Sequence, residues 1–454
     1  EMCIRDSFLT RAQHMEDLRR LDHKIWGIAW PAILSNISIP VLGLVDAAIL
    51  GHLGSAHYLG AVAIGSALLS FLYWGFSFLR MGTTGLVARA MGAAQPDRAL
   101  LVLAQSAVLA LVLSLLIILL HPLWLGWGFA LMSPRPELQP LADSYASIRI
   151  FSAPAVLLTY TVVGWFIGRQ DTRWPMFIVV TTNAANIALD FLLIVGLGMH
   201  SDGAAIATVI AEYLGCALAL FAVWHKLPAL PQRPFYRQLW VISRYRHLLR
   251  SNRHLFLRTL CLLFSFAFFT AMGDKLGSDI LAANALLMHL LLFAAFAMDG
   301  FAFAAEGLAG TRLGAEDLQG FYVAVRRCAR WCAVSAVAIS LLLLVFHQPL
   351  FSVLTNLSEI RQLLLQYYLW LVLLPLVAAP SYLLDGVFIG SAETRYMMTT
   401  MLLSVILVYL PVWYFTQGWG NHGLWLAFTA FNAARGILLY RCYHQLSRSS
   451  AWLG

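Results

Sequence analysis

The sequence has few charged side chains for its length. Of its 454 residues, only 11% are Asp, Glu, Lys or Arg, whereas an ordinary soluble domain carries about 25%. Apolar residues make up 60% of the chain. This composition excludes a soluble enzyme, a disordered protein and a nucleic-acid-binding module.

Cysteine is scarce and scattered along the chain. None of the six cysteines forms a C-x-x-C pair, and Cys328 and Cys332 are separated by one helical turn. The thirteen histidines show no spacing typical of metal ligands. We therefore expect no disulfide, no metal ion, no cofactor and no catalytic residues.

A cleavable signal peptide is also lacking. The first 24 residues are polar, and the first apolar run is longer than the core of a signal peptide. Residues 1–7 read EMCIRDS, without an initiator Met in first position. We expect these seven residues to be non-native.

Long apolar runs dominate what the sequence does contain. A membrane helix needs about 20 mostly apolar residues, and twelve runs meet this requirement. The predicted spans are residues 25–50, 59–79, 99–120, 143–168, 174–195, 203–224, 254–273, 280–304, 322–346, 362–390, 396–416 and 422–440. They predict an all-α polytopic membrane protein with twelve transmembrane helices.

Basic residues gather on one side of these spans. The N-terminus and every second loop hold 20 Lys and Arg, whereas the opposite loops hold 3. Because basic loops stay in the cytoplasm, we expect both termini to be cytoplasmic in a bacterial inner (plasma) membrane. The predicted parts are a cytoplasmic segment 1–24, a bundle 25–224, a cytoplasmic linker 225–252, a bundle 253–440 and a cytoplasmic tail 441–454.

Several short motifs recur at a spacing of about 222 residues. They are Gly164-Trp-Phe-Ile-Gly168 with Gly386-Val-Phe-Ile-Gly390, Gly196-x-Gly198-x-His200 with Gly418-x-Gly420-x-His422, and Leu53-Gly54-Ser55 with Leu276-Gly277-Ser278. This spacing covers six spans, so both halves enter the membrane from the same side. It predicts two six-helix bundles related by a pseudo-two-fold axis along the membrane normal. We interpret the repeated glycines as structural, because they allow helices to approach closely.

Acidic residues inside membrane spans are the first candidates for function. A charged side chain at mid-bilayer costs about 2.5–3.5 kcal/mol on insertion scales. Six acids lie within or at the edge of the predicted spans, namely Asp46, Asp190, Glu212, Asp299, Glu306 and Asp385.

Asp46 follows a proline in the first span. Pro40 removes one helical hydrogen bond and can bend the helix, so protonation of Asp46 could be coupled to the shape of this helix. The alternative is that Asp46 only caps the end of the span.

The fifth span carries three polar residues on one helix face. Asn183, Asn186 and Asp190 are spaced i, i+3 and i+7, so this face points away from lipid. Two amides and a carboxylate can hold a shared proton or coordinate a cation through oxygen atoms. The alternative is a structural seam of hydrogen bonds between helices. Neither Asp46 nor Asp190 has an acidic counterpart at the repeat spacing, which favours a cation site confined to the first half.

The second half offers weaker candidates for cation coupling or substrate binding. Asp299 and Glu306 are seven residues apart and share a face, with Glu306 near the cytoplasmic end, where solvation would explain it. Asp385 lies beside the repeated glycines. The alternative for Asp299 and Asp385 is pairing with Arg258 or with another helix. For Glu212 we favour a hydrogen bond between helices.

Together these motifs resemble the multidrug and toxic compound extrusion (MATE) family over about residues 20–445. The motifs of the first half are Pro40…Asp46-x-x-x-x-Gly51-x-x-Gly54, Gly82-x-x-Gly85, Asn186-x-x-x-Asp190 and Gly203-Ala-Ala-Ile-Ala-Thr208. In the second half, Met298-Asp299-Gly300 and Leu384-Asp385-Gly386 look like the branch named for DNA-damage-inducible protein F.

The resemblance implies a cation-coupled antiporter that exports amphipathic, often cationic, small molecules across the bilayer. The proton site of related proteins would fall on Asp46, Asn186 and Asp190, with Tyr145 and Thr208 as further members. The sodium-coupled branch uses an acid in its seventh span, where this chain carries Arg258 and no carboxylate. We therefore expect coupling to protons, with coupling to sodium as the alternative. We also expect the protein to be a monomer.

Two other functional classes would require features that this sequence shows only weakly. A lipid-linked precursor flippase of the same superfamily would need an arginine-lined cavity, and we find only Arg258 well inside a span. A membrane-embedded transferase would need a polar cluster in its loops, for which His52 and His57 are the nearest candidates. The chain also lacks a G-x-x-x-x-G-K-[ST] motif, which agrees with transport that does not use ATP.

Overall fold

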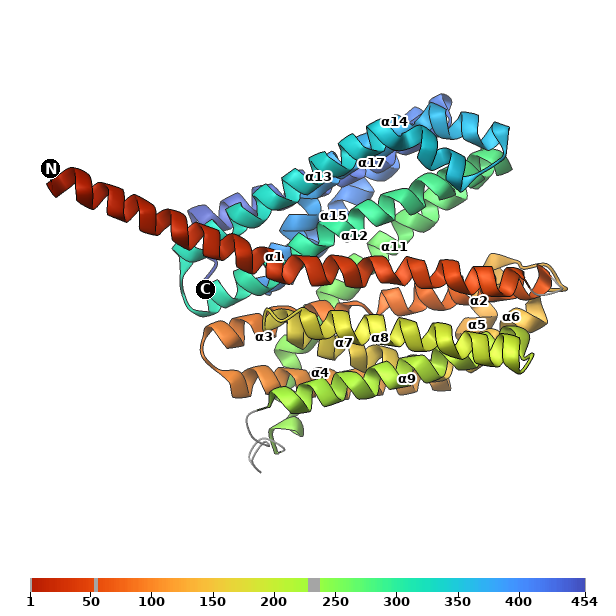
Figure 1. The fold of residues 1–454 in the computed structure, drawn as a ribbon, viewed down its shortest axis with the longest axis horizontal. Helices are drawn as coiled ribbons and strands as arrows, with labels where there is room; N and C mark the ends of the chain where they lie inside the picture. The colour runs from red at the N-terminus through yellow and green to blue at the C-terminus, as the bar shows by residue number, and fades with distance from the viewer. Residues whose placement is uncertain (1, 53–55, 228–236, 454) are drawn as a thin grey trace. The chain divides into compact units, whose positions relative to one another are not determined.

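The computed structural model describes residues 2–52, 56–227 and 237–453, apart from the side chains of residues 2–14, 47 and 56 (Figure 1). All regular elements in these residues are helices. This confirms the all-α prediction and agrees with the need of a lipid-embedded backbone to satisfy its own hydrogen bonds. The repeat motif Leu53-Gly54-Ser55 and residues 228–236 of the predicted linker lie outside the residues described, as does the side chain of Cys3.

Within residues 2–52 and 56–227, the first half contains nine α-helices, one 3-10 turn and one π-helical turn. Their bounds are α1 Met2–Gly51, α2 Ala56–Gly75, α3 Phe78–Gly92, α4 Pro96–Leu119, α5 His121–Met132, α6 Gln139–Arg149, the 3-10 turn η1 Ile150–Ser152, α7 Ala153–Gly168, α8 Arg173–Asp190, the π-helical turn η2 Phe191–Gly196 and α9 His200–Lys226.

The described part of the second half contains seven α-helices, two 3-10 turns and one π-helical turn. Its bounds are η3 Ile242–Tyr245, α11 Arg246–Lys275, α12 Ser278–Gly314, α13 Leu318–Leu354, α14 Ser358–Gly390, α15 Thr394–Ser404, the π-helical turn η4 Val405–Tyr409, α16 Leu410–Thr416, η5 Gln417–Trp419 and α17 Asn421–Arg448.

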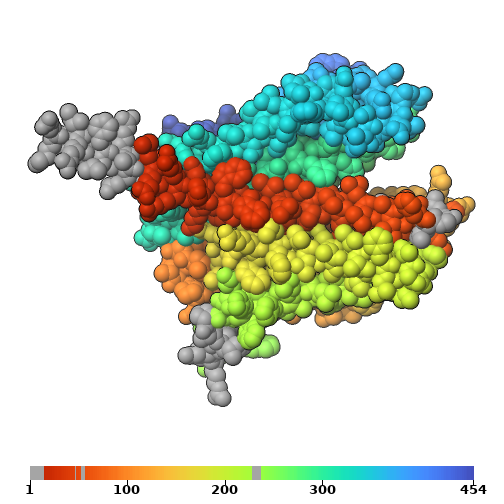
Figure 2. All heavy atoms as spheres, viewed as in Figure 1, coloured from red at the N-terminus to blue at the C-terminus, as the bar shows by residue number. Residues whose placement is uncertain are grey.

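Eleven helical segments of the described chain are long and apolar enough to cross a membrane. They cover the first eleven predicted spans. The twelfth predicted span, 422–440, lies on α17, whose buried Asn432 and Arg435 lower its hydropathy. Large apolar side chains such as Phe177 and Trp224 are exposed on α8 and α9, which lie side by side in the space-filling view (Figure 2). These exposed surfaces are typical of contact with lipid.

The helices form two compact units whose boundaries lie inside helices. We call residues 34–264 the first-half unit, and residues up to Ile33 together with those from Ser265 onward the second-half unit. The beginning of α1 therefore belongs to the second-half unit, and the beginning of α11 belongs to the first-half unit. The predicted bundles, in contrast, are divided in the loops.

Close helix contacts explain this exchange of helix ends. In the second-half unit, a Cβ added at Gly300 of α12 would meet the backbone oxygen of Ala29 of α1 at 2.7 Å. In the first-half unit, a Cβ added at Gly82 of α3 would collide with the Asn252 side chain of α11. In each unit, a glycine therefore allows close packing of the first part of a helix whose second part belongs to the other unit.

The repeat is visible in equivalent backbone contacts. A Cβ added at Gly168 of α7 would meet the backbone oxygen of Thr84 of α3 at 2.8 Å. At the repeat spacing, a Cβ added at Gly390 of α14 would collide with the backbone oxygen of Glu306 of α12. The repeated glycines therefore allow α7 to pack on α3 and α14 to pack on α12, as interpreted from the sequence.

Candidate functional site

The candidate cation site lies in the first-half unit, where α1, α6, α8 and α9 contribute polar side chains. Asp190 ends α8 and is 1% exposed, and Asn186 one turn earlier is 2% exposed. Asp46 of α1 is half-buried. The polar face predicted for the fifth span therefore points into protein.

The carboxyl groups of Asp46 and Asp190 lie close to each other and interact directly. Both side-chain oxygens of Asp190 and Oδ1 of Asp46 are buried and accept no hydrogen bond from another described group. Two adjacent carboxylates repel each other when both are ionised, and a single proton between them removes this repulsion. The pair is therefore chemically suited to bind one proton or to supply oxygen ligands to one cation.

Two amides attach α8 to its neighbours beside this pair. Nδ2 of Asn183 donates to Oγ of Ser38 on α1 at 3.0 Å. Nδ2 of Asn186 lies 3.4 Å from Oγ1 of Thr208 on α9. The hydrogen-bond seam considered from the sequence is thus present, and it holds Asp190 in position. The π-helical turn η2 begins directly after Asp190, and such turns are frequent at functional sites.

The hydrogen bond between helices that was predicted for Glu212 is confirmed, but its partner, an arginine beside the two carboxyl groups, was not predicted. Arg149 at the end of α6 contacts Glu212 of α9, with Nη2 and Oε1 3.1 Å apart. Its Nη1 donates to the hydroxyl of Tyr145, also at 3.1 Å. The positive charge of Arg149 acts electrostatically on both Asp46 and Asp190. Tyr145 therefore takes part in the network through Arg149.

Both residues of this ion pair could be singled out from the sequence, although their pairing could not. Arg149 and Glu212 fall within two predicted spans, 143–168 and 203–224. The prediction that Arg258 is the only arginine well inside a span was wrong, because Arg149, Arg330 and Arg435 are inside spans as well. Arg149 and Arg435 each contact an acid, so neither supplies a free cationic lining of the kind a flippase would need.

Asp385 forms a buried ion pair in the second-half unit. Nη2 of Arg435 on α17 lies 2.8 Å from Oδ2 of Asp385 on α14, and the two side chains are 3% and 9% exposed. Nη1 of Arg435 also donates to Oδ1 of Asn432, and the guanidinium lies over the ring of Phe431. The structural interpretation of Asp385, pairing with another helix, describes this arrangement.

The remaining predicted residues are described by their burial and their local contacts. Glu306 is 1% exposed, so the expectation that solvation explains it was wrong, and Asp299 is half-buried. Helix α1 continues without interruption through Pro40. Nδ1 of His52 contacts the carbonyl of Ala48 in its own helix. Among the residues described, no group of three or more His, Cys, Asp or Glu could hold a metal ion.

Comparison with known proteins gives a consistent result. The sequence profile of the MatE family matches residues 31–192 and 255–415. DNA damage-inducible protein F of Escherichia coli K12 is 39% identical over 454 residues, covering 99% of this chain and 98% of that protein. Protein DETOXIFICATION 44 of Arabidopsis thaliana is 26% identical, covering 95% of this chain and 84% of that protein.

The fold is similar to that of solved transporters. The Vibrio cholerae MATE transporter VcmN in its bent form superposes with a TM-score of 0.83 at 23% identity, covering 96% of this chain and 99% of that chain. A MOP superfamily transporter from Pyrococcus furiosus gives a TM-score of 0.84 at 18% identity, with coverages of 96% and 97%.

Proposed function

The chain belongs to the MATE family, and from this premise we propose that it is a proton-coupled antiporter that exports amphipathic or cationic small molecules. One observation carries the proposal. The buried carboxyl group of Asp190 and the half-buried one of Asp46 face each other without a hydrogen bond from a cationic side chain. A proton is the smallest species that can satisfy such a pair.

The names of relatives support the export of toxic compounds. A probable multidrug resistance protein NorM from Halalkalibacterium halodurans is 23% identical, covering 93% of each chain. The members of the family that match are transporters, and we extend that role to this chain in place of an enzymatic one. We further propose that it acts as a monomer in a bacterial inner membrane, with both termini in the cytoplasm.

The mechanism follows from the chemistry of the carboxyl pair. A proton that enters from the outer side joins Asp46 to Asp190 and removes the repulsion between them. When the proton leaves towards the cytoplasm, the charge of the pair changes from minus one to minus two, which favours a cationic substrate electrostatically. Proton binding and substrate binding therefore exclude each other, and this exclusion converts inward proton movement into outward export.

The proton gradient supplies enough free energy for this exchange. One pH unit is worth about 1.4 kcal/mol per proton, and a membrane potential of 100 mV adds about 2.3 kcal/mol per charge. One proton per cycle could therefore support a several-hundred-fold accumulation outside for an uncharged substrate, or roughly tenfold for a monovalent cation, whose own charge opposes the potential. No ATP is required.

The test uses everted vesicles with a pH gradient, low sodium and a fluorescent cationic dye. The intact protein should transport dye and dissipate the gradient, while Asp46→Asn and Asp190→Asn should reduce transport to the level of empty vesicles at equal expression. Arg395→Gln, an exposed change outside the site, serves as the control variant.

Other outcomes would redirect the proposal. Transport that requires sodium would keep the antiporter and replace the coupling ion. Undiminished transport by both Asn variants would remove the carboxyl pair from the mechanism. If no dye moved with either ion, lipid flipping would be the next activity to assay.

A further inference from the structure

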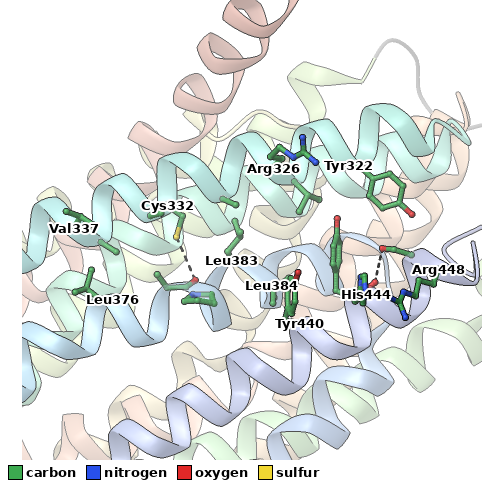
Figure 3. Close-up of a pocket in the computed structure, with 18 residues that line it drawn as sticks. Tyr322, Arg326, Cys332, Val337, Leu376, Leu383, Leu384, Tyr440, His444 and Arg448 are labelled. Atoms are coloured by element: carbon green, nitrogen blue, oxygen red, sulfur yellow. Dashed lines mark hydrogen bonds between the residues drawn. The ribbon is translucent and has the colours of Figure 1, made fainter.

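A cleft in the second-half unit has no part in the proposed transport mechanism. It lies between α13, α14 and α17 and has a volume of about 770 Å³ (Figure 3). This size lies within the range of ligand pockets. The residues that line the cleft are basic at one end and apolar at the other, so a ligand with a polar and an apolar part would bind in one orientation.

One end of the cleft is basic. Figure 3 shows Arg326 and Tyr322 of α13 and His444 and Arg448 of α17 towards this end. Both arginines are exposed. A shallower pocket beside it shares His444 and Arg448 and adds Arg441. None of the residues that line the cleft is acidic, so its positive charge is not neutralised from within.

The other end of the cleft is apolar. Val337 of α13 and Leu376 of α14 lie there in Figure 3, and both are exposed along with Ala333. Pro380 lies inside α14 and lacks an amide hydrogen, so the carbonyl of Leu376 cannot receive the usual helical bond from it. Small residues on α13 and a proline on α14 thus leave a furrow that an alkyl chain can fill.

The wall at the basic end is held by aromatic contacts. Nε1 of Trp452 donates to Oγ of Ser447 at 3.1 Å, and the Trp452 ring packs against Phe321 and Tyr443. Trp452 is fully buried. The last residues of α17 are therefore fixed against α13, and the basic end keeps its shape without a ligand.

We propose that this cleft binds a glycerophospholipid with an anionic headgroup. Its phosphate would lie between Arg326 and Arg448, and one acyl chain would follow the apolar furrow past Ala333. Basic pockets between transmembrane helices recognise anionic headgroups in this way. The same charge repels cationic substrates, which separates the cleft from the transported compounds. Under the proposed topology the basic end lies in the cytoplasmic leaflet, and the lipid class does not depend on that topology.

The experiment uses the purified full chain in phosphatidylcholine nanodiscs with a small fraction of photoactivatable phosphatidylglycerol. Crosslinked peptides are identified by mass spectrometry, and photoactivatable phosphatidylcholine is the comparison lipid. The variant Arg326→Gln/Arg448→Gln removes the basic end. The matched control, Arg98→Gln/Arg395→Gln, removes two exposed arginines elsewhere.

We expect phosphatidylglycerol to label α13 and α17 in the intact protein and in the control. Each arginine near an anionic headgroup contributes about fivefold, so the cleft variant should bind roughly 25-fold more weakly. Ala333→Phe should weaken binding of the long-chain lipid while leaving a short-chain phosphatidylglycerol unaffected, because it fills only the furrow.

Three results would overturn the proposal. Equal labelling by phosphatidylcholine would show that the headgroup charge is not recognised. Labelling that is unchanged in the cleft variant, with correct folding, would exclude the arginines. Displacement of the lipid by inorganic phosphate alone would assign the basic end to a soluble anion.

Discussion

Asp190 in the first-half unit and Asp385 in the second-half unit are both buried acids on transmembrane helices. Asp385 contacts the guanidinium of Arg435, so its charge is balanced permanently by the protein. Asp190 faces another carboxyl group, and its oxygens accept no hydrogen bond from a described group. Each unit has an equivalent internal backbone contact, at Gly168 in the first-half unit and at Gly390 in the second-half unit. The repeat therefore preserves the scaffold, while charge pairing decides whether an acid is available to bind an ion.

The strongest way to test this contrast is to neutralise each acid separately. Asp190→Asn should abolish proton-driven dye export with little loss of stability, because the amide fills the same volume. Asp385→Asn should instead leave Arg435 buried without its partner and lower the free energy of unfolding by about 3–5 kcal/mol. The measurements are vesicle transport and denaturant titration of the purified proteins.

A double variant serves as the control for this prediction. Asp385→Leu/Arg435→Leu removes both charges, and replacing a buried ion pair with apolar residues is often neutral or stabilising. Most of the lost stability should return. A double variant as unstable as Asp385→Asn would contradict a simple ion pair, and proton-driven transport by Asp190→Asn would contradict the contrast itself.

The shared scaffold is tested by adding one methyl group at each repeated glycine. Gly390→Ala should destabilise the protein more than Gly168→Ala, within a range of about 1–3 kcal/mol. The nearest atoms at Gly390 are all backbone of Glu306, whereas those at Gly168 include the side chain of Val87, which can move. Thermal unfolding in detergent would measure both.

Gly27 offers a matched control for these substitutions. No atom lies within 4 Å of a Cβ added there, and alanine has the higher helix propensity. Gly27→Ala should leave the unfolding midpoint unchanged or raise it. Equal effects at Gly168 and Gly390 would mean that side-chain adjustment does not distinguish the two contacts.

The field around the carboxyl pair is tested at Arg149. A nearby positive charge favours the ionised carboxylate, so Arg149→Gln should favour proton binding. The pH at which dye export is half-maximal should rise by about one unit, equivalent to about 1.4 kcal/mol. Glu212→Gln should move the midpoint in the opposite direction, because it removes the negative partner of Arg149. Shifts in the same direction would show that both changes act by distorting the site.

The smallest effect is expected at the hydrogen-bond seam. Asn183→Ala removes the bond to Ser38 and should cost about 0.6 kcal/mol, the average for such bonds between transmembrane helices. Denaturant titration should show no further loss when Asn183→Ala is made in a Ser38→Ala background. A further loss of the same size would mean that Asn183 stabilises α8 through another contact.

Much of the fold was predictable because membrane helices are encoded locally. Each apolar run is long enough to cross the bilayer, and eleven predicted spans coincide with helices that meet this requirement. Asp46, Asn186 and Asp190 stood out because polar groups in lipid are costly. The structure brings these helices together, while the role of the three residues in coupling stays a prediction.

Contacts between segments that are distant in the sequence could not be predicted from the composition of those segments. Arg149 contacts Glu212 on another helix, 63 residues away in the sequence. Neither predicted span by itself indicates that the two residues pair. The unit boundaries at Ile33 and Phe264 lie inside equally apolar stretches, so no change in composition marks them. The cleft between α13, α14 and α17 likewise depends on how three helices pack.

The division of α1 between the two units has a consequence for biosynthesis. Asp22, in the part of α1 that belongs to the second-half unit, binds Arg327 and Trp331 of α13, which follow 305 and 309 residues later in the chain. During translation the first part of α1 must therefore wait until α13 has been inserted before its packing is complete. Two half-chains produced separately would each lack part of a unit, since α1 and α11 link the halves as continuous helices.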